Sequence, residues 1–298
     1  MKKITGYLRL TRPANIITAV SDVLAGIAMA GTLVFSRFDI SAVIFLVLST
    51  SFLYGGGVVL NDVFDAELDK IERPERPIPS GLIKKSYAAL FGIMLLIAGI
   101  TSAALSGIVS DFPATLLIAL AIAVAAMVYD KWTKHHSFFG PLNMGICRGL
   151  NLLLGIGIYT AALQFYWYFA FVPVIYIFAI TMISRGEVHG GKKTTMYIAA
   201  LLYAIVNASI LLVAYRSEHF LQTLPFITLF AIMIFTPLLK AIEKPEGPRI
   251  GKAVKSGVIS LIVMNAAWAA AFGNLRLAVV IIVLLPVSIL LSRLFAVT

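Results

Sequence analysis

Long runs of apolar residues, separated by short polar stretches, occupy nearly all of this 298-residue chain. A helix needs about 20 mostly apolar residues to cross the hydrocarbon core of a bilayer. Ten segments satisfy this pattern, at 14–35, 41–60, 86–109, 113–130, 142–162, 166–183, 194–215, 221–239, 253–273 and 277–296. The eighth and tenth are the weakest candidates. Because backbone groups in lipid must be hydrogen-bonded internally, the pattern predicts an all-α, polytopic transmembrane helix bundle of nine or ten spans.

Basic residues are concentrated on one side of this predicted bundle. With a cytoplasmic N-terminus and ten spans, 21 of the 24 Lys and Arg residues fall on the inner side, and Arg37, Arg216 and Arg276 fall in the outer loops. The positive-inside rule therefore predicts an integral, multi-pass protein of the cell membrane with its N-terminus and longer loops in the cytoplasm. The first segment is longer than a signal-peptide core and lacks a persuasive cleavage site, so we expect it to remain as a span.

Composition agrees with a membrane location and adds little else. The chain is 60% hydrophobic and 13% charged with a mean hydropathy of +0.96, which excludes a soluble globule. Its net charge of +10 follows from the basic inner loops, so we expect no nucleic-acid partner, whereas anionic membrane lipid or an anionic substrate remains possible. There is no linker or low-complexity tract, so residues 1–298 are interpreted as one membrane domain.

An acid-rich stretch, NDVFDAELD, follows the second apolar segment. If the helix continues, Asn61, Asp62, Asp65 and Asp69 lie on one face. Like charges at this spacing repel one another, so something positive is expected there. Carboxylate and amide oxygens suit Mg²⁺ or a similar hard cation.

The next stretch, KIERPERPIPSG, supplies basic residues and three prolines. Mg²⁺ is commonly bound by one or two carboxylates together with substrate phosphates, which indicates a diphosphate substrate. The Arg73 and Arg76 guanidinium groups match phosphate oxygens in a bidentate way. The alternative is an ordinary solvated loop whose charges cap a helix.

Polar residues also occur at the ends of other spans and inside them. Tyr129 and Lys134 end the fourth segment, where they either bind a phosphate and a cation or form an interfacial belt. Asp22 lies within the first segment, where a lone carboxylate costs about 2.5–3.5 kcal/mol, so it either lines a cavity or has a hydrogen-bonded partner. Asn143, Arg148 and Asn151 lie in the fifth segment, and for the asparagines helix packing is as good an explanation as ligand contact.

These motifs together resemble the UbiA-type superfamily of intramembrane prenyltransferases. The resemblance depends on N61-D62-x-x-D65-x-x-x-D69, R73-x-x-R76-P77-I78-P79-S80-G81, Y129-x-x-x-x-K134, G140, N143, R148-G149-L150-N151 and R9-x-x-R12-P13-x-N15. It implies a helical bundle around a central cavity open to the lipid. It also implies a prenyl diphosphate bound through Mg²⁺, whose prenyl chain is transferred to an aromatic or other lipid-soluble acceptor; we expect an aromatic one.

The resemblance also implies roles for individual residues. Asn61, Asp62, Asp65 and Asp69 would hold the metal, with Asp62 and Asp65 essential to catalysis. Arg73, Arg76 and Lys134 would bind the diphosphate, Tyr129 would lie beside the developing allylic cation, and Asn15 would line the cavity near the substrate. From their positions in the chain we also expect Asp22, Asn143 and Arg148 in the substrate cavity.

The sequence departs from the family at its second acidic motif, after the sixth segment. Ile180 and Ile183 stand where the family has aspartates, so that Glu187 is the one acid left for metal binding. Basic residues could replace the missing metal charge at a leaving phosphate; the candidates are Arg185, His189, Lys192 and Lys193. The stretch SRGEVHGGKK is similar to the EboC-like branch of the superfamily.

We therefore expect a magnesium-dependent prenyltransferase acting at the cytoplasmic membrane face. The degenerate second motif keeps two alternatives open. One is a non-catalytic binder or transporter of a prenylated or phosphorylated lipid precursor, and the other is a related diphosphate chemistry such as cyclisation or hydrolysis.

Overall fold

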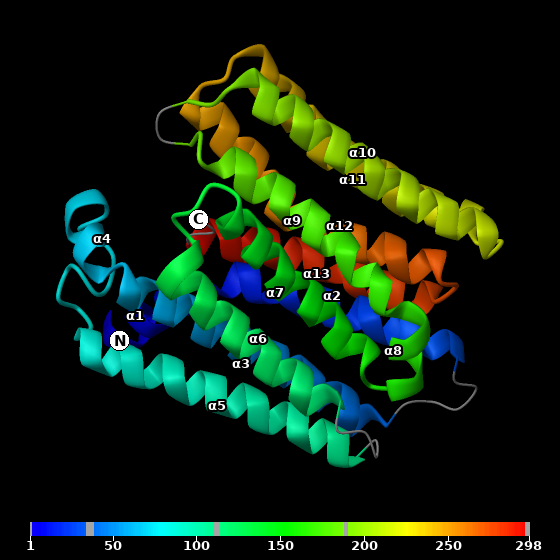
Figure 1. Cartoon of the computed structure of the whole chain (residues 1–298), viewed down its shortest axis with the longest axis horizontal. Coiled ribbons are helices and arrows are strands. Elements are labelled where there is room, and N and C mark those ends of the chain that lie inside the picture. Colours follow the sequence, from blue (N-terminus) through cyan, green and yellow to red (C-terminus); the bar gives the residue numbers. More distant parts are fainter. Residues whose placement is uncertain (1, 34–38, 110–113, 188–189, 296–298) are drawn as a thin grey trace.

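The computed structural model describes residues 2–33, 39–109, 114–187 and 190–295. These residues form helices and no strand, and the long helices lie side by side along the long axis of the molecule (Figure 1). The α-helices are α1 (Lys2–Thr11), α2 (Pro13–Ala30), α3 (Ile40–Phe64), α4 (Ala66–Glu72), α5 (Lys85–Val109), α6 (Ala114–Val128), α7 (Phe139–Ile156), α8 (Thr160–Tyr166), α9 (Phe171–Ser184), α10 (Lys193–Arg216), α11 (Phe220–Glu243), α12 (Gly247–Ala271) and α13 (Leu275–Leu294). Short helical turns are η1 (Gly31–Leu33), η2 (Tyr129–Thr133) and η3 (Trp167–Ala170).

The predicted bundle of membrane spans is confirmed. Nine helical stretches within the described residues are long and apolar enough to cross a bilayer, with α8, η3 and α9 forming one of them. Helix α7 is more polar, but its 18 residues are about 27 Å long and run among the other spans (Figure 1). The start of α1 and the end of α13 lie at the same end of the bundle in Figure 1, as an even number of crossings requires, so α7 makes the tenth.

Helices α2 and α12 form the centre of the bundle. In each, 83% of the residues in the apolar window are buried, whereas the corresponding share in α13 is 22%. The peripheral helices present apolar side chains outward, among them Ile97 and Leu117, which are 58% and 65% exposed. A soluble protein would not leave so many large apolar side chains in water, so this exterior faces lipid and the chain is an integral membrane protein.

Helices α2 and α7 approach each other at two glycines. A Cβ atom added at Gly26 would lie 2.4 Å from the Leu152 carbonyl oxygen, and one added at Gly155 would lie 2.1 Å from the Val23 carbonyl oxygen. Small residues allow this kind of close helix contact in membranes. The contact brings polar residues of α2 and α7 together deep in the bundle.

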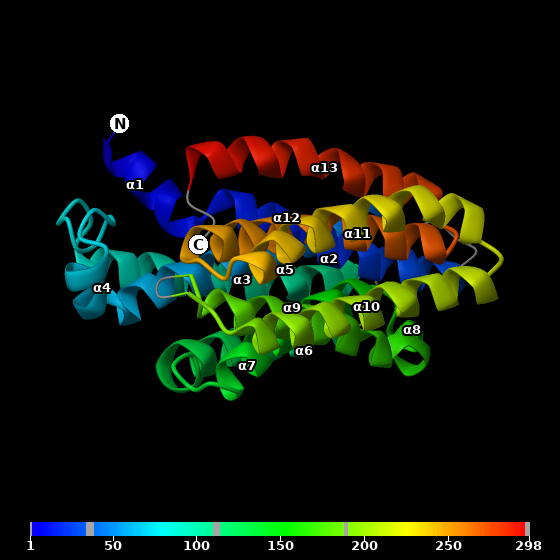
Figure 2. The same cartoon turned by 90° about the horizontal axis from the view of Figure 1, so that it is seen from above.

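The acid-rich stretch forms a nearly continuous helix that leaves the bundle at one end (Figure 2, where α4 projects beside α1). Asp65 separates α3 from α4, yet backbone hydrogen bonds continue through it, from Asp65 N to Asn61 O at 2.9 Å and from Asp69 N to Asp65 O at 2.8 Å. The proline-containing segment then turns back, and its Ile78 packs in a small cluster with Leu10 of α1. The loop is thereby fixed beside the ends of α1 and α3.

Candidate functional site

A cavity of about 190 Å³ opens among α3, α6 and α7. Its polar lining residues include Arg12, Asn61, Tyr129, Asp130, Arg148 and Asn151, and its apolar walls include Leu53, Ile122 and Met144. Along α3, Asn61 follows Tyr54 by seven residues, which corresponds to about 10 Å. The cavity therefore has one polar end near the acid-rich stretch and a second polar end deeper in the bundle.

Each aspartate of the acid-rich stretch contacts a basic side chain. Asp62 accepts hydrogen bonds from Arg12 Nη2 at 2.8 Å and from Arg76 Nη1 at 3.3 Å. Asp69 accepts one from Arg76 Nη1 at 2.8 Å, and Asp65 pairs with Lys134. These side chains are mostly buried, with Asp62 7% and Lys134 9% exposed. The positive charge expected beside these acids is thus supplied by the protein itself. We call this group of three acids and three bases, namely Asp62, Asp65, Asp69, Arg12, Arg76 and Lys134, the charge cluster.

Arg12 reaches the charge cluster from a strained backbone conformation. Its φ of 47° and ψ of 68° lie in the left-handed region, which costs a residue with a side chain about 1–2 kcal/mol. Pro13 begins α2 directly after it. In the sequence, Arg12 belongs to the motif R9-x-x-R12-P13-x-N15, but this motif alone assigns no ligand to the Arg12 side chain.

Asp130 is a second site residue that the sequence reasoning missed. It lies in the π-helical turn η2, is 4% exposed, and accepts a hydrogen bond from Asn61 Nδ2 at 2.7 Å through Oδ1. Its Oδ2 is buried and has no hydrogen-bond partner among the described residues. An unsatisfied buried acceptor is costly, and π-turns are frequent at functional sites. The sequence did contain a feature that points to Asp130, because an ionisable residue at the end of an apolar span is commonly functional.

Other predicted residues lie outside the cavity. Arg185 donates from Nη2 to the His136 carbonyl at 2.5 Å and borders a separate hollow that Lys192 also lines. Burial raises the pKa of the Glu187 carboxyl, and the positive charge of Arg73 opposes that rise. Ile180 and Ile183, at the positions of the family's aspartates, are each 3% exposed in the apolar core. His189 lies outside the described residues.

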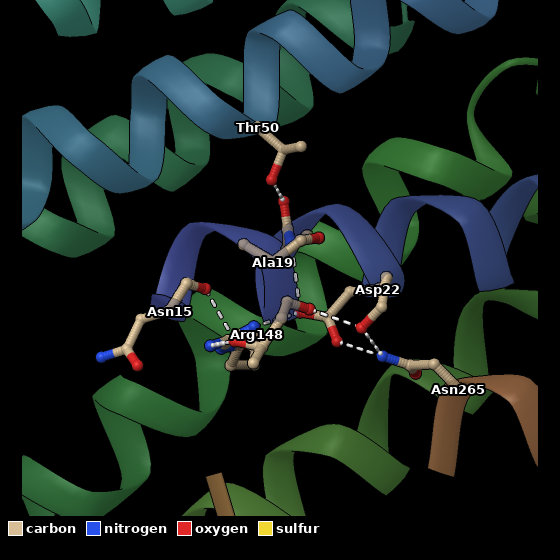
Figure 3. Close-up of polar contacts among 9 residues, drawn as sticks. Asn15, Ala19, Asp22, Thr50, Arg148 and Asn265 are labelled. Carbon is tan, nitrogen blue, oxygen red and sulfur yellow. Dashed lines mark hydrogen bonds and ion pairs between the residues drawn. The ribbon is translucent and has the colours of Figure 1, made fainter. Parts of the chain in front are cut away.

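A buried polar network lies at the deep end of the cavity (Figure 3). Asp22 accepts hydrogen bonds from Arg148 Nη1 at 2.7 Å and Asn151 Nδ2 at 3.1 Å through Oδ2, and from Asn265 Nδ2 at 2.7 Å through Oδ1. Arg148 also donates to Thr18 Oγ1 at 2.6 Å. Asp22 therefore has hydrogen-bond partners on two other helices, which is expected because an unpaired carboxylate inside the membrane is energetically costly.

Of the four residues predicted to belong to the substrate cavity, one lines it and three do not. Arg148 lines the cavity and lies over the Tyr54 ring, 5.1 Å from its centroid. Asp22 lies behind Arg148, and Asn143 donates to Thr133 Oγ1 at 3.0 Å. Neither Asp22, Asn143 nor Asn15 is among the residues that line the cavity in the described part of the chain.

The chemistry of the charge cluster and its neighbours suits a hard cation, because Asn61, Asp62, Asp65 and Asp130 all present oxygen atoms. Within the described residues, however, no three acidic, His or Cys side chains converge at a spacing that holds a metal ion. The acids are turned toward Arg12, Arg76 and Lys134 instead. The donor set fits Mg²⁺, provided that an anionic ligand draws the basic side chains away.

Comparison with known proteins gives consistent matches. Residues 19–254 match the model of the UbiA prenyltransferase family. A digeranylgeranylglyceryl phosphate synthase of Sulfurisphaera tokodaii is 27% identical over 261 residues, covering 80% of this chain and 88% of that protein. Another, of Saccharolobus solfataricus, is 32% identical over 188 residues, which is 61% of each chain. The chain therefore matches about three fifths of the length of that second relative.

A solved structure has the same fold. It is that of a UbiA homologue from Archaeoglobus fulgidus bound to DMAPP and Mg²⁺, with a TM-score of 0.62 and 16% identity, covering 91% of this chain and 99% of the other. Because the two sequences are only 16% identical, this structural similarity establishes the shared helical fold alone.

Proposed function

The chain belongs to the UbiA prenyltransferase family, and from this we propose that it transfers a prenyl group from a prenyl diphosphate to a lipid-soluble acceptor in a magnesium-dependent reaction at the cytoplasmic membrane face. Residues 1–298 act in this proposal as one membrane domain. The EboC-like branch suggested by SRGEVHGGKK stays a prediction.

The observation that carries the proposal is the charge cluster at one polar end of a largely apolar cavity. A magnesium diphosphate contains both a cation and an anion, and the cluster offers a counterpart to each. Asp62, Asp65 and Asp69, with Asn61, would hold Mg²⁺, and Arg76 and Lys134 would bind phosphate oxygens. The described residues that line the cavity do not include Arg73, Arg185, Glu187 or Lys192, so we assign these four to the outer part of the diphosphate site.

The proposed reaction breaks the bond between the prenyl C1 and the diphosphate oxygen, and the bonding pair leaves with the diphosphate. The nucleophilic atom of the acceptor, a hydroxyl oxygen in a glycerol-phosphate lipid, forms the new bond to C1, and its proton passes to the released diphosphate. Bound Mg²⁺ would supply Lewis-acid stabilisation of that leaving charge. Arg76 and Lys134 would stabilise the same charge once the diphosphate has drawn them away from the acids. Tyr129 lines the cavity beside Asn61, where its ring can face an allylic cation. The apolar walls hold the prenyl chain and exclude water that would trap the cation.

The acceptor follows less directly from the site. Two relatives are named digeranylgeranylglyceryl phosphate synthase, which favours a glycerol-phosphate lipid with a free hydroxyl over the aromatic acceptor expected from the sequence. The orientation is supported by the basic residues, which gather at the end of the bundle that carries the charge cluster.

The test uses the purified full-length protein in lipid nanodiscs. It is incubated with Mg²⁺, prenyl diphosphates of increasing chain length, and either a glycerol-phosphate lipid or an aromatic acceptor, and products are identified by mass spectrometry. We expect one donor and acceptor pair to give a prenylated lipid. Recovery of intact prenyl diphosphate from every mixture would contradict transfer and favour the binder, and acceptor-independent products would favour cyclisation or hydrolysis.

A further inference from the structure

Arg12 is held in place from both sides of its strained backbone. On its N-terminal side, Leu10 of α1 is fully buried, and Gly6 packs so closely that an added Cβ would lie 2.9 Å from a methyl carbon of Leu82. On its C-terminal side, Pro13 begins α2. A left-handed residue that is not glycine persists where the surrounding structure determines it, and such residues cluster at ligand sites.

The charges around Arg12 are unevenly distributed. Asp62 contacts two guanidinium groups, from Arg12 and Arg76, while the neighbouring Asp130 keeps one buried carboxylate oxygen without a partner among the described residues. Arg12 and Asp130 both line the cavity. A cation bound near Asp130 and Asp62, together with an anion bound by Arg12, would satisfy every one of these groups.

We propose that Arg12 is a diphosphate-binding residue that Asp62 holds in the ligand-free protein, so that metal ion and diphosphate compete with the same ion pair. This inference rests on the proposed function and goes beyond it by adding a residue and a coupling between the two ligands. A metal ion on Asp62 must displace Arg12, and a diphosphate on Arg12 must draw it from Asp62. When both ligands bind, the pair is broken only once, so each ligand strengthens the binding of the other.

The test measures each ligand alone, in nanodiscs of zwitterionic lipid. Mn²⁺ binding is followed by electron paramagnetic resonance, and sodium pyrophosphate binding by calorimetry with EDTA present. Arg12→Gln should bind Mn²⁺ about fivefold more tightly and pyrophosphate about fivefold more weakly, and Asp62→Asn should show the reverse, since such couplings are commonly 5-fold or more. Arg9→Gln and Glu67→Gln remove the same charges from exposed side chains nearby and should stay within about twofold of the wild type.

A general electrostatic effect predicts the same signs, so the double variant decides between the two explanations. If Asp62 restrains Arg12, Arg12→Gln should weaken pyrophosphate binding more in the Asp62→Asn background than in the wild type, by about fivefold. Effects that add independently would overturn the inference, as would weaker pyrophosphate binding by Asp62→Asn. Should Arg12→Gln not fold, Arg12→Met replaces it in both backgrounds, because it keeps most of the side-chain length and removes the same charge.

The two proposals fail in different ways. If the wild type forms a prenylated product but the effects of Arg12→Gln and Asp62→Asn are additive, the inferred role of Arg12 is wrong and the proposed transferase activity still stands. A non-additive cycle in a protein that forms no product supports the coupled site and rejects the proposed reaction.

Discussion

Replacing Asp22 by leucine should destabilise the bundle strongly, because it leaves the charge of Arg148 without its carboxylate counter-ion inside the membrane. Asp22 accepts three side-chain hydrogen bonds, from Arg148, Asn151 and Asn265, and is 1% exposed. Arg148 is 5% exposed, so its guanidinium cannot turn to water. Removing one member of a buried ion pair costs about 3–5 kcal/mol, and we expect Asp22→Leu to lie in this range.

The double variant Asp22→Leu/Arg148→Met should recover most of that loss. A buried ion pair replaced by apolar residues of similar volume is commonly neutral or stabilising, because the desolvation of both charges is removed as well. The expected coupling between the two positions is therefore about 3 kcal/mol, of opposite sign to the single effects.

Equilibrium unfolding in mixed micelles, followed by far-ultraviolet helicity, measures these differences. The only cysteine, Cys147, is partly buried beside Arg148, and its alkylation rate reports whether this region opens with the rest. Glu67→Leu breaks the exposed pair with Lys70 and should have no measurable effect. Equal losses in Asp22→Leu and the double variant would refute the reasoning, since they would mean that Arg148 is not stranded when Asp22 is removed.

Further outcomes follow from the same structure. Lys134→Gln leaves Asp65 without its partner and should lower kcat by about 10²–10³-fold with little loss of folded protein, measured by product formation and by size-exclusion chromatography. Gly155→Ala would place a Cβ 2.1 Å from the Val23 carbonyl oxygen and should cost about 1–3 kcal/mol or more of unfolding free energy, whereas Gly55→Ala, with its nearest contact at 3.7 Å, should be tolerated. Burial raises the pKa of the Glu187 carboxyl in the folded protein, so the folded protein binds this proton more tightly than the unfolded chain does. The wild type should therefore lose stability relative to Glu187→Gln as the pH rises from about 4.3 through the raised pKa. Thermal unfolding of both proteins at pH 4.5 and 7.5 measures this difference. A difference that grows toward low pH would contradict the assigned burial.

The spans could be predicted because each one is encoded locally. The expected segment at 142–162 corresponds to α7, but the helix ends at Ile156, because Gly157 and the residues after it form a turn before α8. Boundaries of this kind depend on packing, which hydropathy does not record.

The candidate site was predictable in its composition but not in its pairing. The shared face of Asp62, Asp65 and Asp69 predicts that positive charge gathers there, and it does. The partners come from distant parts of the chain, with Arg12 50 residues before Asp62 and Lys134 69 residues after Asp65. Helix periodicity cannot relate positions so far apart, and the role of Asp130 depends on the same long-range contact with Asn61.

The central claim is that the charge cluster binds a magnesium prenyl diphosphate and releases its diphosphate during transfer. The most direct measurement is the amount of pyrophosphate formed per prenylated lipid by the wild type, Asp62→Ala, Asp65→Ala and Glu67→Gln, with Mg²⁺ or with EDTA. We predict equal amounts of both products from the wild type and Glu67→Gln with Mg²⁺, and neither product from the two Asp variants or in EDTA. Undiminished product from Asp62→Ala and Asp65→Ala would contradict the account.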